Sequence, residues 1–499
     1  MAPHGTGSAD SEMSSSLGDV AARGTRVTLL TQLLRFLLLI TALVVLARLL
    51  SPEDFGIVAM VTSIIGVAEI IRDFGLATAA VQSRTLSDGE RTNLLWANVA
   101  IGTVCAGVAV LCIPLIVMLF DEPRLQPIIL ALAGVFVLNG ATTQFQAELT
   151  RSLRFKALAG ADILAQAAGI ALAITMALLE FSYWAIVAQQ ITVSVLTLTF
   201  MALVCRWRPG RPRRSIPIGR FFRFGGGVFG TQLISYVTRN VDNVAIGAYS
   251  GAGPLGLYTR AYQLLMTPLN QLNAPMTRIA LPVLSRVQDD DETYGRYLAK
   301  SQLFGCYLTA TIFAVSAGLA VPLVDILFGP RWTEVAPIFA ILAMGGVFRA
   351  MDQLAYWIYL SRGHTGAQLR LFLITGPVMT VIILAGLPWG PVGVAVGCSV
   401  AYTLHWALSL WYVGRKAKID SAALFRTAAR SVLLVSVPCG LLAFGASLLI
   451  HGSLAQLALG LLAVLVYLAA ALTLIPRVRH DAGIITDLVR RAFARRLTT

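Results

Sequence analysis

The chain has 499 residues, of which 57% are hydrophobic and 13% are charged, and its formal net charge is +14. A soluble globular protein usually carries about 25% charged residues, so this composition predicts a polytopic membrane protein. The basic residues cluster in short segments between apolar runs, as membrane topology requires, which argues against a nucleic-acid partner. The six cysteines form no CxxC motif and the five histidines are scattered, so we expect no disulfide framework, metal site or cofactor.

Fourteen apolar segments of the chain are long enough to cross a bilayer as helices, which predicts an all-α fold. A polar tail over residues 1–26 precedes them, and a basic amphipathic tail over residues 477–499 follows them. The predicted spans are residues 27–50, 55–82, 93–120, 127–147, 157–179, 183–205, 221–250, 254–286, 299–328, 333–361, 368–388, 391–413, 427–451 and 454–476.

The connecting loops alternate between strongly basic and nearly neutral. The longest basic loop is RWRPGRPRRSIPIGR, residues 206–220, whereas the opposite set of loops offers little beyond Arg48, Arg124 and Arg331. Because basic loops remain in the cytoplasm, both termini are predicted to be cytoplasmic.

A weak internal repeat spans the basic loop of residues 206–220. LSPEDFGIVAM (50–60) is similar to SGAGPLGLYTRA (250–261), and six predicted spans separate the two copies. Both copies would therefore begin on the same side of the membrane, as in transporters whose parallel repeats enclose a central cavity. The predicted domains are a first lobe over 27–205, the basic linker over 206–220, a second lobe over 221–413, and two additional helices over 427–476.

The segment SYVTRNVDNVAIG, residues 235–247, places Arg239 and Asp242 inside a hydrophobic run. A charge at the bilayer centre costs about 2.5–3.5 kcal/mol, so such residues normally face a bundle interior or an aqueous cavity. Gln232, Ser235, Arg239 and Asp242 are spaced by three, four and three residues, so they lie on one helical face. We interpret this stripe as the lining of a polar cavity. The alternative is an ion pair that only neutralises the helix.

Three other predicted spans carry polar residues in similar positions. Gln263 and Asn270 belong to a stripe in a span with three prolines, Arg349 and Asp352 repeat the spacing of three residues, and Arg35 has no acidic partner in its own helix. The alternatives are an ion pair between Arg349 and Asp352, and an Arg35 side chain that extends to the headgroups. Basic residues outnumber acidic ones on these stripes, so the predicted cavity suits an anion such as phosphate or pyrophosphate.

Features that the chain lacks narrow its function. There is no GxxxxGK[ST] motif, so energy for transport would come from an ion gradient, a substrate gradient or a partner. The acidic run at residues 288–292 is expected to be a solvated loop, and the loops opposite the basic set are too short to hold the acceptor of a glycan polymerase. We therefore expect a transporter rather than an enzyme.

Five strings of the sequence carry a family resemblance over about residues 25–420. LSPEDFGIVAM, RDFGLATAAVQ, SYVTRNVDNVAIG, GPLGLYTRAYQL and LNQLNAPMTRIALPVLSRVQ resemble the bacterial polysaccharide flippases, in the colanic-acid and succinoglycan exporter branch of the multidrug/oligosaccharidyl-lipid/polysaccharide exporter superfamily. The resemblance implies two six-helix lobes that form a V around a central cavity in the bacterial inner membrane. It implies movement of an undecaprenyl-pyrophosphate-linked oligosaccharide to the periplasmic leaflet by alternating access, with cavity roles for Arg35, Arg239, Asp242 and Arg349.

The expected partners follow from this resemblance. They are the lipid-linked oligosaccharide, membrane lipids, a coupling ion that is a proton or sodium, and polysaccharide polymerase or export machinery. The alternatives are a lipid II-type flippase or a multidrug/cation antiporter of the same superfamily, a glycan polymerase, and a scaffold without transport. An antiporter would need unpaired acidic residues in the first lobe, which offers mainly Glu69, Asp73 and Asp162.

Overall fold

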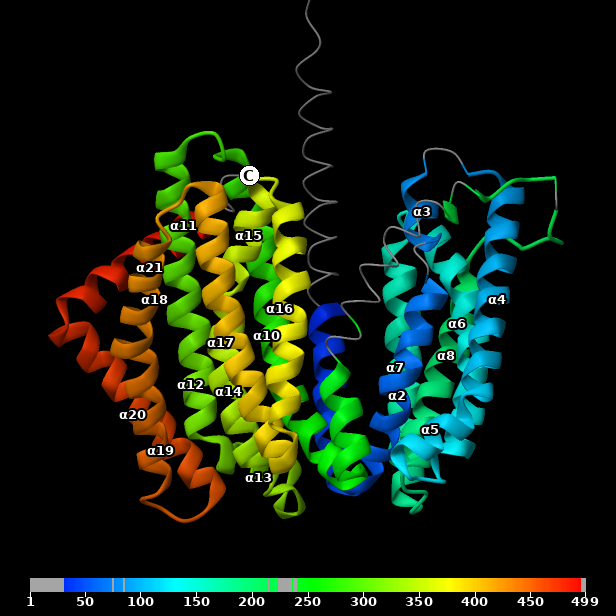
Figure 1. Ribbon diagram of the computed structural model, residues 1–499, viewed down its shortest axis with the longest axis horizontal. Coiled ribbons are helices and arrows are strands. Elements are labelled where there is room, and N and C mark those ends of the chain that lie inside the picture. Colours follow the sequence, from blue (N-terminus) through cyan, green and yellow to red (C-terminus); the bar gives the residue numbers. More distant parts are fainter. Residues whose placement is uncertain are drawn as a thin grey trace, which may run out of the picture. The chain divides into compact units, whose positions relative to one another are not determined.

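The computed structural model describes residues 31–73, 76–83, 86–213, 215–219, 221, 222, 236 and 240–494. Within these ranges the regular structure is helical, without a strand (Figure 1). Ten helical segments among them are long and apolar enough to cross a membrane. The expectation of an all-α, multi-pass membrane protein is therefore confirmed.

The number of fourteen spans stays a prediction. One of the ten apolar segments, Thr365–Ala417, has 53 residues and covers the two predicted spans 368–388 and 391–413. The helix α10 (Ala252–Arg286) has 35 residues and covers a further predicted span, but it is not among the ten. Most of the predicted span 221–250 lies outside the described residues.

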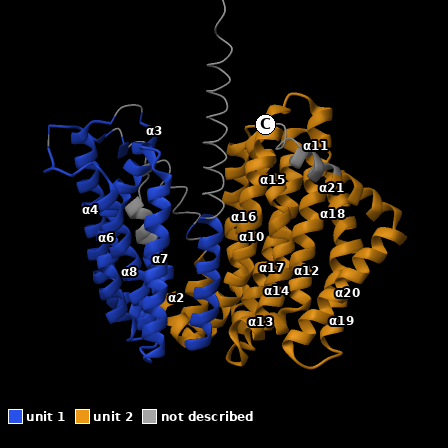
Figure 2. Ribbon diagram, turned by 180° about the vertical axis from the view of Figure 1, so that it is seen from behind, with its two compact units in different colours: residues 1–51, 61–237, 495–499 blue, residues 52–60, 238–494 orange. Residues whose placement is uncertain are grey.

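Internal contacts divide the chain into two compact units, which Figure 2 colours separately. Unit 1 comprises residues 1–51, 61–237 and 495–499, and unit 2 comprises residues 52–60 and 238–494. The helix α2 (Pro52–Asp73) contributes its residues up to Met60 to unit 2 and the remainder to unit 1. The lobe boundaries at the basic loop rest on the sequence alone and stay a prediction.

Unit 1 is a helical bundle in which α4 and α6 pack backbone against backbone. An added Cβ at Gly102 would lie 2.5 Å from the carbonyl oxygen of Phe136, and one at Gly140 would lie 2.6 Å from that of Asn98. Small residues permit such close approach between membrane helices. Besides the end of α2, the described helices of this unit are Thr31–Leu49, α3 (Leu76–Gln82), α4 (Asp88–Leu111), α5 (Ile113–Phe120), α6 (Leu125–Arg151), α7 (Phe155–Leu178) and α8 (Trp184–Val204).

Unit 2 contains the start of α2, the helical residues 240–250, and all later elements. These elements are α10, α11 (Asp291–Gly305), the π-helical turn η1 (Cys306–Ala310), α12 (Thr311–Gly318), α13 (Ala320–Phe328), η2 (Pro330–Trp332), α14 (Val335–Met351), α15 (Gln353–Ser361), α16 (Thr365–Ala385), η3 (Leu387–Trp389), α17 (Gly390–Ala417), α18 (Ser421–Ser431), the π-helical turn η4 (Val432–Ser436), α19 (Val437–Ser447), α20 (Ser453–Leu474) and α21 (Pro476–Ala494).

Within unit 2, α2 and α10 cross at two glycines that belong to the two copies of the sequence repeat. An added Cβ at Gly56 would lie 1.7 Å from the carbonyl oxygen of Ala252, and one at Gly256 would lie 1.7 Å from that of Pro52. These residues are related by a shift of 200 positions, so each helix offers the same positions to the other. No side chain fits this contact, which explains glycine at both positions.

The predicted span 299–328 differs from the structure at its start and in its interior, while its end at Phe328 agrees. The helix begins at Asp291, because the Asp290 carboxylate accepts a 3.0 Å hydrogen bond from the Thr293 backbone N–H and caps it. Its first stretch, α11, continues through η1 into α12, and Leu319 then separates α12 from α13. The prediction of a solvated loop over residues 288–292 is therefore wrong for its last residues, which form a helix cap and first turn.

The two additional C-terminal helices pack on the part of unit 2 formed by α12 and α13, where α19 contacts α12, and α20 contacts both α19 and α13 (Figure 1). A Cβ added at Gly318 would lie 2.3 Å from the carbonyl oxygen of Gly440, so α12 and α19 are in backbone contact. Asp481, which is 3% exposed, connects the C-terminal amphipathic helix α21 to α18 and η1. Its Oδ2 accepts hydrogen bonds from Arg430 at 2.7 Å and from Tyr307 at 3.0 Å. The start of α21 is thus tied to the protein rather than only to lipid.

Candidate functional site

A buried carboxylate, Asp242, lies at the centre of a polar cluster in unit 2. It belongs to the helical residues 240–250 and is 5% exposed. Its Oδ2 accepts a 2.7 Å hydrogen bond from the Tyr258 hydroxyl on α10, and its Oδ1 accepts a 2.9 Å bond from the Asn243 backbone N–H. The fully buried Tyr258 hydroxyl also lies 3.2 Å from the Cys398 sulfur on α17. Both oxygens of this carboxylate therefore have partners.

Arg349 on α14 forms the cationic part of the same cluster. Its guanidinium carbon lies 4.6 Å from the centre of the Tyr402 ring on α17, a cation–π contact. The Tyr402 hydroxyl is 3.4 Å from that of Tyr262, whose ring stacks on Tyr258 with centroids 6.1 Å apart. Tyr258 and Tyr262 are four residues apart on α10, so both rings lie on one face of that helix. We name the following residues the tyrosine cluster: Asp242, Tyr258, Tyr262, Arg349, Cys398 and Tyr402.

Asp352 follows Arg349 by three residues but turns to different partners. Its Oδ2 lies 3.6 Å from Nε2 of His405 on α17, and Nδ1 of that histidine lies 3.0 Å from the Thr375 hydroxyl on α16. Its Oδ1 is buried and receives no hydrogen bond from any described residue. The alternative of a neutralising ion pair between Arg349 and Asp352 is therefore wrong, because the neighbouring helices offer each side chain a different partner.

In unit 1, Arg35 forms an ion pair with Asp162 of α7, with Nη2 and Oδ2 2.5 Å apart. The two side chains are 41% and 35% exposed. Arg35 therefore has the acidic partner that its own helix lacks, and the alternative of a side chain extending to the headgroups stays open. Asp162 is also one of the few acidic residues that a cation antiporter would need unpaired, and it is occupied by an arginine.

The remaining predicted site residues differ in burial, and two of them lie outside the described part of the chain. Gln263 is half-buried and Asn270 is exposed, both on α10. Gln232 and Arg239 lie outside the described residues, so the pairing of Arg239 with Asp242 stays a prediction.

Sequence reasoning missed the tyrosines and His405, which supply most partners of the charged groups. The signal available for Tyr258 and Tyr262 is their spacing of four residues on a helix that also carries Arg260. Arg260 itself packs flat on the Phe55 ring, 3.9 Å from its centre, within unit 2. These polar partners are difficult to recognise because single tyrosines in membrane helices are ordinary core residues.

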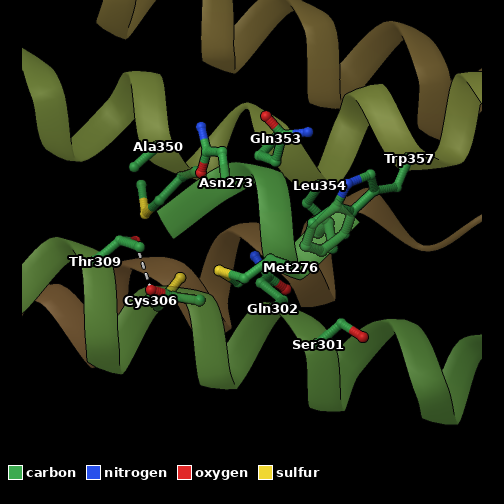
Figure 3. Close-up of a pocket in the computed structure, with 12 residues that line it drawn as sticks. Asn273, Met276, Ser301, Gln302, Cys306, Thr309, Ala350, Gln353, Leu354 and Trp357 are labelled. Carbon is green, nitrogen blue, oxygen red and sulfur yellow. Dashed lines mark hydrogen bonds between the residues drawn. The ribbon is translucent and has the colours of Figure 1, made fainter. Parts of the chain in front are cut away.

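A small cavity of about 20 Å³ lies between α10, α11, α14 and α15 of unit 2 (Figure 3). This volume holds about one water molecule. Gln353 and Trp357, which line it, both donate hydrogen bonds to the Thr277 hydroxyl, at 3.1 and 3.0 Å. The cavity is too small for a sugar. In the described ranges, no three His, Cys, Asp or Glu side chains gather as metal ligands would.

Comparison with known proteins decides the family. The family model described as "Polysaccharide biosynthesis protein" matches residues 45–337, more than half of the chain. The chain belongs to this family. The polysaccharide exporter resemblance of its sequence strings is thereby confirmed.

Relatives within the polysaccharide biosynthesis family are similar over most or much of their length. The lipopolysaccharide biosynthesis protein WzxC of Escherichia coli (strain K12) is 26% identical over 425 residues, which cover 82% of this chain and 84% of WzxC. The succinoglycan biosynthesis transport protein ExoT of Rhizobium meliloti is 25% identical over 301 residues, which cover 60% of this chain and 61% of ExoT.

Among solved structures, the lipid II flippase MurJ in an inward closed conformation has a similar fold. The TM-score is 0.69 at 13% sequence identity, and the match covers 90% of this chain and 98% of that chain. At this identity the likeness concerns the fold alone. This member of the polysaccharide biosynthesis family thus has the fold of a membrane flippase.

Proposed function

We propose that the chain is a flippase that moves an undecaprenyl-pyrophosphate-linked oligosaccharide repeat unit from the cytoplasmic to the periplasmic leaflet of a bacterial inner membrane. It would act by alternating access, in exopolysaccharide or lipopolysaccharide biosynthesis, and without catalysis. The family match over residues 45–337 carries the proposal. The names of WzxC and ExoT, and the flippase fold shared with MurJ, support it.

The tyrosine cluster supplies the chemistry that such a substrate needs. Arg349 lies on the Tyr402 ring and forms no ion pair with a described carboxylate, so no acidic side chain occupies its donors. A guanidinium presents forked donors that match two phosphate oxygens. Tyrosine rings offer flat apolar faces and hydroxyls, which suit a sugar ring with its hydroxyl groups. We assign pyrophosphate binding to Arg349, with Arg35 and Arg239 as the other proposed anion-binding residues.

The coupling ion is proposed to bind at Asp352. The oxygens of Asp242 are both hydrogen-bonded, whereas Oδ1 of Asp352 is buried and has no hydrogen-bond partner among the described residues. A buried carboxylate oxygen without a partner is costly unless a proton or a cation satisfies it. Nε2 of His405 lies 3.6 Å from the other oxygen of this carboxylate.

The test of transport begins with deletion of the gene in its host. Surface glycan and undecaprenyl-linked intermediates are then measured, and the wild-type gene or the Arg349→Ala variant is restored. We expect the deletion to deplete surface glycan and accumulate lipid-linked intermediates, and R349A to restore little. Normal glycan without accumulation would overturn the flippase proposal in a strain with no second exporter of this family.

Arg426→Ala is the matched control for the loss of one positive charge. Arg426 is 78% exposed and lies 4.0 Å from the 66% exposed Asp420, so this ion pair contributes little to the stability of the fold. This variant should restore glycan fully. Equal failure of R426A and R349A would remove Arg349 from the proposed site.

Orientation and partners complete the proposal. The distribution of basic loops supports cytoplasmic termini, which reporter fusions at residues 1 and 499 would test. The polysaccharide polymerase or export machinery would receive the flipped unit, and co-purification after cross-linking would detect that contact.

A further inference from the structure

A second cavity, of about 570 Å³, lies in unit 1 where the start of α4, the end of α6 and the loop after α8 meet. Residues 206–213, the first part of the basic loop of residues 206–220, contribute to it. Five arginines and two acidic residues line the cavity, which gives it a net charge of +3. Four of these arginines belong to the basic loop: Arg206, Arg208, Arg211 and Arg213.

The basic loop is held on α4 by hydrogen bonds with two side chains of that helix. The Asn93 side chain, only 9% exposed, donates to the carbonyl oxygens of Arg213 and Ile216 at 2.8 and 3.0 Å and accepts from the Arg213 N–H at 2.8 Å. The Trp96 indole N–H donates to the Gly210 carbonyl oxygen at 3.0 Å. The backbone at Gly210 and Arg213 is therefore held on α4, which lowers the cost of ordering this part of the loop around a ligand.

The two acidic residues of the cavity are already engaged. Asp88 and Glu148 each place a carboxylate oxygen 3.3 Å from Nη1 of Arg91. The four arginines of the basic loop that line the cavity form no ion pair with any acidic residue in the described part of the chain. The cavity thus has an excess of positive charge, and no described acidic residue pairs with the four arginines of the loop.

Charge pattern and aromatic residues place this cavity at the membrane surface. The basic loop belongs to the loops predicted to be cytoplasmic, and the leaflet on that side carries anionic lipids. Trp96, which is 44% exposed, lies beside the loop, and tryptophan is enriched at the level of the headgroups. Arginine binds phosphate through forked donors. We infer that the cavity binds the phosphate of a membrane lipid headgroup.

The inference goes beyond the proposed function, since lipid is bound here whether or not a glycan is moved. Two sources share the chemistry: an anionic phospholipid of the bulk membrane, and a polyisoprenyl pyrophosphate. A volume of 570 Å³ is large enough for either headgroup.

The test measures lipid binding to the full-length protein in nanodiscs of phosphatidylcholine. One arm titrates phosphatidylglycerol and the other a polyisoprenyl pyrophosphate, with native mass spectrometry or fluorescence transfer as the readout. The variant is R206Q/R211Q/R213Q. Each basic residue near the surface contributes about fivefold, so we expect about a hundredfold weaker binding. Inorganic pyrophosphate should compete in either arm.

The control R415Q/K416Q/K418Q removes three positive charges from the end of α17 in unit 2, where Arg415 and Lys416 lie on aromatic rings. Equal weakening by both triple variants would overturn the inference, because net charge alone would then explain binding. Binding of neither lipid by the wild type, or of free pyrophosphate alone, would also overturn it. Selective loss in the phosphatidylglycerol arm identifies a bulk lipid, and selective loss in the other arm identifies the carrier lipid; both support the site.

A second variant separates the site from membrane insertion. Trp96→Phe keeps the charge and an aromatic ring, which is smaller, but removes the N–H that donates to the Gly210 carbonyl oxygen. We expect severalfold weaker lipid binding with unchanged yield in the membrane. Unchanged binding would show that the fixed position of the loop is irrelevant and would contradict the inference.

Discussion

The positive charges of Arg35 in unit 1 and Arg349 in unit 2, both in membrane helices, are stabilised by different kinds of partner. Arg35 lies 2.5 Å from the Asp162 carboxylate, in a pair about one-third to two-fifths exposed. Arg349 lies on the Tyr402 ring and has no ion pair among the described residues. The ring stabilises the guanidinium without cancelling its charge. An anion can therefore bind Arg349 directly, whereas it must displace Asp162 from Arg35.

The two carboxylates of unit 2 show the same contrast. Asp242 is saturated by the Tyr258 hydroxyl and a backbone N–H, while Asp352 keeps one buried oxygen without a hydrogen bond among the described residues. A saturated group stabilises the fold, and an unsaturated one is available to a ligand. The comparison supports the ion-binding role proposed for Asp352 and favours a structural role for Asp242.

The largest effect should follow from changing Arg349. R349A should reduce flipping at least tenfold, and R349K should recover part of it, because lysine keeps the charge but loses the forked donors. The measurement is the ratio of lipid-linked intermediate to surface glycan. If R349K were as active as the wild type, a single positive charge would be sufficient for flipping, and neither the forked donors nor the Tyr402 contact of Arg349 would be needed.

Removing the hydroxyl that satisfies Asp242 should cost stability. Tyr258→Phe leaves a buried carboxylate oxygen without its donor, at a cost of about 1–3 kcal/mol in the free energy of unfolding. Tyr402→Phe is the control, since it keeps the ring under Arg349 and leaves Asp242 untouched. Thermal unfolding in detergent should rank Y258F well below Y402F. The reverse order would show that Asp242 does not depend on Tyr258.

A smaller change should follow from releasing Arg35. Asp162→Asn breaks an ion pair that is partly exposed, so stability should change by less than about 1 kcal/mol. If Arg35 binds the anionic headgroup, the released guanidinium should bind it about threefold more tightly, as measured by substrate retention in nanodiscs. Weaker retention in D162N would mean that Asp162 positions Arg35 rather than competing for it.

The smallest effect on stability is expected from a change at Asp290, outside the membrane, because water can hydrogen-bond to an exposed carboxylate there. Hydrogen bonds from Thr293 hold the pKa of Asp290, the N-cap of α11, below its usual value. Because the folded-state pKa is lowered, the cap stabilises α11 above the unfolded-state pKa of about 3.9 and is lost as the pH falls through the folded-state value.

In D290A, the Thr293 amide should exchange hydrogen faster than in the wild type at pH 7. The difference should fade in acid, where the wild-type carboxyl is protonated. Asp289→Ala, one residue before the cap, is the control and should exchange like the wild type. A difference that persisted in acid would mean that the carboxylate is not the source of protection.

The sequence predicts the helical membrane fold and the family, because apolar length, basic loops and family strings are local properties of the chain. It also identifies Arg35, Asp242, Arg349 and Asp352 as costly residues that need partners. It does not identify those partners. Asp162 is 127 residues from Arg35, and Tyr258 is 16 residues from Asp242 on another helix.

The failure at Arg349 and Asp352 has a physical cause. Spacing of three residues allows an ion pair on one helix, but such a pair competes with every group that neighbouring helices present. Tyr402 and His405 on α17 are those groups, and their position depends on how α14, α16 and α17 pack. Helix packing is a property of the whole fold, so no local window of sequence contains it.

The glycine crossing of α2 and α10 bears on the ancestry of the chain. Pro52 contacts Gly256 as Ala252 contacts Gly56, which is the reciprocal pattern of a contact across a twofold axis. Two identical half-length chains would make this contact with one another using a single glycine position. The crossing therefore has the local twofold symmetry that duplication and fusion of a half-length chain would produce, with the two glycines at equivalent positions of the repeat.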